Sequence, residues 1–351
     1  MIKWSDIAVL AVLVSLAGCT RMEIAIPERE VTFSVGSQTP ATKAVAVTEF
    51  DHFSSKGYLH AEGVNTVQDF FGTSGETISY NSTTTEWQPS HPYYWPKSEN
   101  SYVNFISWYD ENGAPDTVTE DTIEWTNRTI TADDNILIAN KAWYQKSNVQ
   151  NYFTPGVPTL FKHLLAQVAV QAKATIETET VGNVTTTWSV NVSDVNIHDV
   201  LTTGSISLTN TTAPDAEQAL KITEWSGSWE TDSTTGSISG SASSTPINTS
   251  SYTVVLPLHA VLPQSVADIY MSLKYEVTTT SENTTTHHTH TFTETVNVPE
   301  LALSSFSGYV GNWDPNKRIT YSLNINPKTN IISVTPTVVS WETDNKDIIV
   351  E

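Results

Sequence analysis

Alternation of apolar and polar residues is the feature that most constrains the fold of this chain. Side chains of an extended strand point to opposite faces in turn, so a period of two puts one face on a core and the other in water. Clear examples lie at residues 31–35, 188–192, 270–277 and 319–325. Turn signals rich in Gly, Asn and Pro separate these segments at short intervals. The pattern predicts an all-β chain of short strands packed as β-sandwiches.

Three segments need a separate interpretation. Residues 161–174 could form a helix, but the alternation within 167–173 favours a strand. Residues 36–43 have almost no apolar side chains and predict a linker between the first strand and the body of the protein. The run 232–251 is nearly all Ser, Thr and Gly, which predicts an exposed, mobile loop.

Chain length and one proline-rich interruption predict two domains. A chain of 351 residues can form two domains of ordinary size, each with its own core. Two prolines and a glycine interrupt the alternation at residues 152–158. We therefore expect an N-terminal β-sandwich over residues 44–155 and a C-terminal β-sandwich over residues 156–351.

The N-terminus has the pattern of a signal peptide. Lys3 precedes an apolar run at residues 7–16, about half the ~20 residues that a membrane-spanning helix needs. Leu16-Ala17-Gly18-Cys19 resembles a bacterial lipobox, in which the final Cys is acylated and the peptide is cut before it. We expect loss of residues 1–18 and a lipid tether on Cys19. The alternative is an ordinary secretory signal that is cut nearby.

Charge and motif content exclude several classes of function. The chain has 17 Lys plus Arg against 38 Asp plus Glu, a formal net charge of −21, so nucleic acid is not an expected partner. Its single Cys, if it carries lipid, leaves no thiol for a disulfide, a metal or a nucleophile. Common catalytic motifs are absent from the sequence, so we predict no enzyme and no cofactor. A carboxylate pair of the glycosidase kind stays open, because such pairs meet only in the fold.

Histidines and aromatic residues allow alternative interpretations. His287, His288 and His290 could ligate a metal, but no cluster of Cys or carboxylates accompanies them, so a solvated hairpin is preferred and no metal site is predicted. His163 is interpreted as a packing residue. One aromatic group could stack on sugar rings or fill a core. Its members are Trp87, Tyr93, Tyr94, Trp95, Trp108 and Tyr109.

An ordered set of motifs resembles the fimbrillin and Mfa-like lipoproteins of Bacteroidales. After the lipobox and first strand, the set comprises Thr42-Lys43-Ala44, residues 92–96, 102–109, 134–139, 160–166 and 312–316, then Tyr321 and Trp341. The resemblance spans nearly the whole mature chain. It implies two tandem transthyretin-like β-sandwiches and a subunit of a surface fimbria, anchored by lipid in the outer membrane beside other fimbrial subunits. The family commonly has Arg in place of Lys43 and Gly in place of Asn316, and Asn tolerates the left-handed conformation of such a turn.

The resemblance also implies a route of assembly. In fimbrillins a trypsin-like protease removes the first strand, and a C-terminal strand of another subunit fills the exposed apolar groove. In this chain the displaced strand would carry Val31, Phe33 and Val35 on one face, with Lys43 and Ala44 flanking the cleavage site. The alternative is a permanent edge strand followed by an ordinary loop lysine.

The candidate donor strand lies near the C-terminus. Ile332, Val334 and Val338 share one face of an expected strand, which Ile348-Ile349-Val350 could extend. Pro336 lacks a backbone donor and suits a sheet edge. The alternative is the last native strand of the C-terminal domain.

These features together predict a structural or adhesive subunit of a cell-surface fimbria, assembled by protease-triggered strand exchange. Its adhesive ligand would be a host or bacterial surface glycan or protein. The alternative function is a monomeric surface lipoprotein that binds glycans through exposed aromatic residues.

Overall fold

The computed structural model describes residues 30–36, 50–98, 100–145, 156–212, 220–240 and 244–341. Within these ranges the regular structure consists of strands and one short 3-10 helix, η2 (Leu303–Ser305), which confirms the predicted all-β class. No helix in the described ranges is long and apolar enough to cross a membrane. The predicted lipid site at Cys19 and the predicted cleavage site at Lys43 and Ala44 lie outside these ranges.

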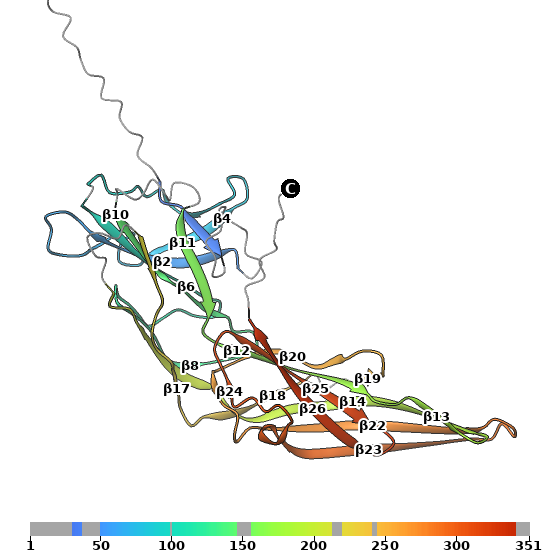
Figure 1. The fold of residues 1–351 in the computed structure, drawn as a ribbon. Helices are drawn as coiled ribbons and strands as arrows, with labels where there is room; N and C mark the ends of the chain where they lie inside the picture. Colours follow the sequence, from blue (N-terminus) through green and yellow to red (C-terminus); the bar gives the residue numbers. More distant parts are fainter. Residues whose placement is uncertain are drawn as a thin grey trace, which may run out of the picture.

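The first sheet gathers the strands at one end of the elongated molecule (Figure 1). Its order is β16 (Leu220–Thr223), β10 (Lys141–Gln145), β6 (Tyr102–Asp110), β9 (Ile136–Ala139), β11 (Val157–His163), β1 (Phe33–Gly36), β5 (Glu86–Pro89), β4 (Glu76–Asn81), β2 (His52–His60) and β3 (Gln68–Asp69). Because β2 also pairs with β6, the strands from β6 through β1 to β2 close into a ring. This differs from the predicted N-terminal sandwich, since alternation fixes which face is buried but not whether a sheet closes on itself.

Two further sheets enclose a second core. One has the order β20 (Thr253–Val261), β12 (Ala166–Ala174), β25 (Lys317–Asn326) and β26 (Ile331–Ser340). The other has the order β13 (Thr178–Val181), β14 (Val184–Leu201), β22 (Tyr270–Asn283) and β23 (Thr289–Ala302). Inward side chains of both sheets, such as Leu256, Leu323, Ile197 and Leu273, form one buried cluster. Strands β13, β14, β22 and β23 extend toward the end opposite the first sheet (Figure 1).

Smaller sheets lie between these two regions. Their orders are β17 (Trp229–Thr231), β15 (Thr203–Thr209), β8 (Thr122–Thr129) and β7 (Thr117–Val118), and β21 (Gln264–Ser265) with β24 (Asn312–Trp313). A third buried cluster, which we call the junction cluster, includes Trp108, Ile138, Leu165, Leu262 and Trp341. Both β11 and β15 pair with strands from before residue 155, so segments on both sides of the predicted domain boundary share sheets.

Two segment predictions have definite outcomes. Residues 161–174 form the end of β11 and the whole of β12, with a bend at Leu164 and Leu165, so the strand interpretation is confirmed. The predicted mobile loop at 232–251 is wrong in its described parts. There β18 (Thr235–Ser239) and β19 (Thr245–Ile247) both pair with β14. Ile238 and Ile247 pack on the second core, and hydroxyl-rich sequence concealed these two inward positions.

Asn316 adopts a left-handed conformation, with φ of 59°. Since Gly has no Cβ and a β-branched residue is strained there, we expect Asn316→Gly to leave stability nearly unchanged and Asn316→Val to cost about 1–2 kcal/mol. Chemical unfolding of the two variants measures the difference. Equal unfolding midpoints would contradict a conformational requirement at this turn.

Candidate functional site: the slot of the first strand

Strand β1 closes the ring of the first sheet by pairing on both sides. It runs parallel to β11, with Phe33 opposite Val157 and Gly36 opposite Leu160, and antiparallel to β5, with Phe33 opposite Trp87. The described pairings therefore make β1 an interior strand and not the edge strand of the alternative interpretation. We call the space that β1 fills between β5 and β11 the β1 slot.

The three side chains predicted to face one way on this strand all lie in the core of the ring. Val31, Phe33 and Val35 are at most 1% exposed. The ring of Phe33 lies edge-on to Phe53 and Phe105, with centroid distances of 5.6 and 5.4 Å. Burial of such side chains stabilises a fold by about 1.5–3 kcal/mol each, and edge-to-face aromatic pairs add about 0.5–1.5 kcal/mol. The ring core therefore depends strongly on a very short segment.

Hydrogen bonds also fix Val31 and Thr32, the two residues that precede β1. The Val31 N–H donates to the Tyr93 carbonyl over 2.8 Å, and the Val157 N–H donates to the Thr32 carbonyl over 2.7 Å. The Tyr93 hydroxyl donates to Glu76 Oε2 over 2.9 Å, and burial together with this bond raises the pKa of Tyr93. The rim of the slot is thus polar, whereas its interior is apolar.

Gly156 lets the chain enter β11 directly against β1. Its φ is +104°, and a Cβ placed there would lie 2.7 Å from the carbonyl carbon and oxygen of Thr32. No other residue fits this approach without displacing the backbone. The glycine, which the sequence had suggested as part of a domain boundary, therefore serves the packing of β1 against β11.

The candidate donor strand coincides with β26, which pairs only with β25 among the described strands. Its place at a sheet edge agrees with the expectation from Pro336. Val334 is 7% exposed, and Ile332 is half-buried against the second core. Ile332, Val334 and Val338 pair with Ile325, Leu323 and Ile319 of β25, so they share one face of β26. Val338 is nevertheless 43% exposed, so its side chain is only partly covered.

Most of the aromatic group fills the core. Trp87, Trp95, Trp108 and Tyr109 are all buried, while Tyr94 is 41% exposed. A flat platform for sugar rings needs several exposed aromatic rings, but of this group only Tyr94 is exposed. The packing interpretation of the group accounts for these positions.

The histidines fall into two different surroundings. His287, His288 and His290 lie exposed on the β22–β23 hairpin, and the described part of the chain has no group of three side chains that could hold a metal ion. His163 is buried, donates a hydrogen bond from Nδ1 to Asn135 Oδ1 over 2.9 Å, and stacks on Trp341. His163 therefore serves in packing, as predicted.

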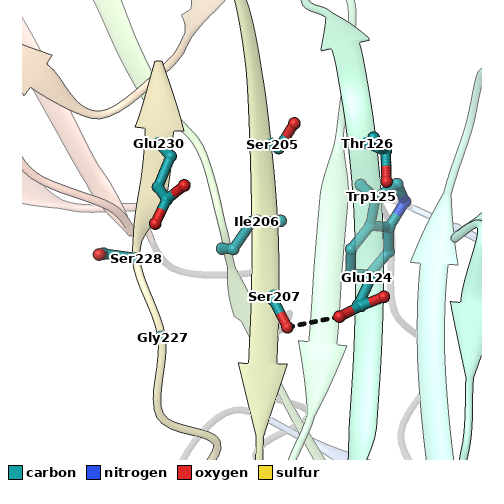
Figure 2. A pocket seen from close by; sticks show the side chains of 9 residues that line it. All are labelled: Glu124, Trp125, Thr126, Ser205, Ile206, Ser207, Gly227, Ser228 and Glu230. Carbon is teal, nitrogen blue, oxygen red and sulfur yellow. Dashed lines mark hydrogen bonds between the residues drawn. The ribbon is translucent and has the colours of Figure 1, made fainter. Parts of the chain in front are cut away.

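A shallow groove of about 410 Å³ lies over β8, β15 and β17 (Figure 2). It brings Glu124 and Glu230 to the two sides of β15, and the Ser207 hydroxyl donates to Glu124 over 2.8 Å. The ring of Trp125 is buried, and its Nε1 donates to Asp110 over 3.0 Å. The groove therefore offers hydroxyl and carboxylate groups to solvent and not an aromatic face.

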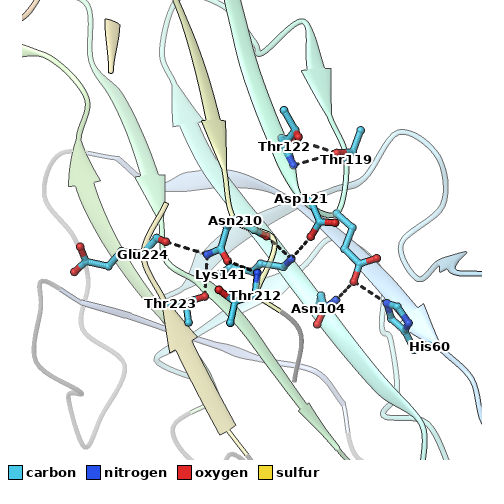
Figure 3. A network of polar contacts seen from close by, with 11 residues as sticks. His60, Asn104, Thr119, Asp121, Thr122, Lys141, Asn210, Thr212, Thr223 and Glu224 are labelled. Carbon is cyan, nitrogen blue, oxygen red and sulfur yellow. Dashed lines mark hydrogen bonds and ion pairs between the residues drawn. The ribbon is translucent and has the colours of Figure 1, made fainter. Parts of the chain in front are cut away.

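Lys141 forms a buried polar network between β10 and the strands beside it (Figure 3). Its Nζ donates to Asp121 Oδ1 over 2.8 Å and to the Asn210 carbonyl over 3.0 Å. Asn210 in turn donates to Thr223 Oγ1 over 2.8 Å. A buried charge is tolerated only when it is paired and hydrogen-bonded, so this network ties the first sheet to the sheet of β8 and β15.

The sequence also matches a known protein family. A family model described as fimbrillin-like matches residues 53–341. None of the curated proteins matches the chain.

Solved structures that match this chain include proteins of Bacteroides and Porphyromonas species. A candidate cell adhesion protein of Bacteroides uniformis is 14% identical, with 89% of this chain and 99% of that chain covered and a TM-score of 0.47. A fimbrial protein of Bacteroides vulgatus is also 14% identical, with 89% and 99% covered and a TM-score of 0.43. The fimbrial anchor protein Mfa2 of Porphyromonas gingivalis is 10% identical, with 90% and 99% covered and a TM-score of 0.31. Because the family model spans most of the chain, the protein belongs to the fimbrillin-like family.

Proposed function

We propose that this protein is a subunit of a surface fimbria, exported as an outer-membrane lipoprotein through Cys19 and assembled by strand exchange after cleavage between Lys43 and Ala44. In this proposal residues 19–43 form the tether and the removable segment. The mature subunit would begin at Ala44 and would contain the rest of the first sheet and the sheets of the second core. Its partners are other fimbrial subunits.

The observation that carries the proposal is the position of β1. It is short, it completes a closed ring, and it precedes all other described strands, so cleavage after it would separate it from the rest of the protein. Residues 157–160 of β11 pair with β1, whereas only residues 161–163 pair with β9. Loss of β1 would leave the backbone groups of 157–160 without their sheet partner. Such groups are a template for an incoming strand.

The incoming strand must replace the apolar contacts of Val31, Phe33 and Val35. The C-terminal segment has suitable alternation in Ile332 and Val334 of β26, and Ile348, Ile349 and Val350 lie further along the chain, outside the described residues. We therefore propose that β26 and the residues after it supply the donor to a neighbouring subunit. Val338, being exposed, contributes little to this role.

Phe33→Ala tests the contribution of β1 to the ring. Because Phe33 is completely buried among aromatic rings, we expect a loss of about 3–5 kcal/mol in the free energy of unfolding of the first region. The matched control, Val338→Ala, removes an exposed valine and should change stability by less than about 0.5 kcal/mol. Chemical denaturation followed by near-ultraviolet circular dichroism measures both. Similar losses in the two variants would contradict a special role for β1.

Lys43→Gln tests the processing step. Mass spectrometry of surface filaments should find a mature N-terminus at Ala44 in the wild type. The Gln variant should keep an acylated Cys19 and stay out of filaments, since a trypsin-like protease needs a basic residue there. The matched control Lys43→Arg keeps the positive charge and should assemble normally. Filaments built from chains with an intact acylated Cys19 would rule out cleavage as the trigger.

A synthetic peptide with the sequence of residues 331–351 tests the donor. Added to protein cleaved after Lys43, it should occupy the β1 slot and reduce SDS-resistant multimers in proportion to its concentration, because it competes with the same segment of other subunits. A peptide with the same residues in scrambled order should have no effect. Unchanged multimers in the presence of saturating peptide would show that the donor lies elsewhere.

A further inference from the structure

Trp341, the first residue after β26, is fixed against the strand that forms one wall of the β1 slot. Its ring stacks on His163, the last residue of β11, with 3.8 Å between ring centroids and 12° between the planes. Trp341 is 3% exposed and His163 is 2% exposed. The end of the candidate donor strand and the end of the slot wall therefore share one buried contact.

A backbone connection reinforces this contact. The Trp341 N–H donates to the Asn316 carbonyl over 3.0 Å, and the Asn316 N–H donates to the Leu165 carbonyl over 2.9 Å. Leu165 lies in the bend between β11 and β12, two residues after His163. Trp341 is thus held at the β11–β12 bend both through its side chain and through its backbone.

The position of His163 depends in turn on β11, whose partners are divided along its length. Residues 157–160 pair with β1, and residues 161–163 pair with β9. When β1 is absent, more than half of β11 loses its partner on that side. Segments with few remaining hydrogen bonds and buried contacts open locally more often, so the support beneath Trp341 weakens.

We infer that Trp341 is a latch that couples the occupancy of the β1 slot to the retention of β26 in its own subunit. While β1 is in place, β11 is rigid, His163 supports Trp341, and β26 stays paired with β25 in its own subunit. Removal of β1 loosens β11 and frees the segment for a neighbour. The inference rests on the proposed strand exchange, and it names the step that would keep a precursor from donating its strand before it can accept one.

A plain packing role for Trp341 makes a different prediction. In that case Trp341→Ala would destabilise the junction cluster, but perturbing β1 would not change the opening of β26. The two possibilities are separated by measuring exchange locally and by combining the two perturbations.

Hydrogen–deuterium exchange of the full chain tests the latch. We expect Phe33→Ala and Trp341→Ala each to speed exchange of the β26 amides about tenfold relative to the β14 and β22 amides, which report the rest of the C-terminal sandwich. The double variant should add little to either single change, because both act through the same contact. Trp341→Phe keeps an aromatic ring on His163 and should restore most of the protection.

The control is Trp225→Ala. Trp225 packs on the same junction cluster, but its indole N–H donates to the Ala139 carbonyl over 2.9 Å, so it is bonded to β9 and not to the bend that holds Trp341. It should leave exchange of β26 at the wild-type rate. The latch is overturned if Phe33→Ala speeds β26 no more than β14 and β22, or if the effects of the two single variants multiply independently.

Multimer formation by protein cleaved after Lys43 separates this inference from the proposed function. Multimers without coupled exchange would overturn the latch and leave strand exchange standing. Coupled exchange without multimers would keep the latch and overturn strand exchange as the function.

Discussion

The packing of Phe33 between Phe53 and Phe105 is the contact on which the closed first sheet depends. It places the first residue of β1 inside a ring of strands, where the backbone pairs with β11 on one side and with β5 on the other. A ring of strands has no free edge only while every member is present. A segment as short as β1 therefore determines whether the sheet is closed, and its neighbours are built to receive it, as the close approach of Gly156 to Thr32 illustrates.

The C-terminal region is stabilised in a different way from the first sheet. Its two sheets face each other across one core, and neither depends on a single short strand to be complete. Beyond that core, the ends of β13, β14, β22 and β23 have both faces in water, and Thr side chains there form cross-strand pairs such as Thr278 with Thr293. Thr combines a hydroxyl with the β-branched shape that favours a strand, so it holds an extended sheet together without an apolar face. These strand ends are rich in Thr because both of their faces are exposed to water.

Alternation in the sequence located several strands, among them β12, β22 and β25, and the buried faces of Val31, Phe33, Val35 and Val334. The left-handed turn at Asn316 was expected from the family resemblance, because the family commonly has Gly at this position and Asn tolerates the same conformation. Ring closure did not follow, because the pairing of β2 with β6 depends on strand curvature and not on local pattern. The strands β18 and β19 were missed since each offers one inward isoleucine among hydroxyl residues. The stack of His163 on Trp341 joins distant parts of the chain, and no local signal predicts it.

The incomplete pairing of β1 in its slot explains why a donor strand from another subunit could replace it in the proposed exchange. β1 meets β5 in a single pair of residues, Phe33 with Trp87, although β5 spans Glu86–Pro89, and it covers only residues 157–160 of β11. A longer donor could make all the contacts of β1 and add backbone pairs along β5 that β1 does not form. Each added hydrogen bond contributes about 0.5–1.5 kcal/mol, so a few extra pairs outweigh the native strand once the covalent link of β1 is cut. The intact link makes β1 an intramolecular partner with a high effective concentration, and this advantage is what proteolysis would remove. In the proposed exchange, cleavage would thus remove the entropic advantage of the covalent link, and the extra backbone pairs available along β5 would favour the longer donor strand.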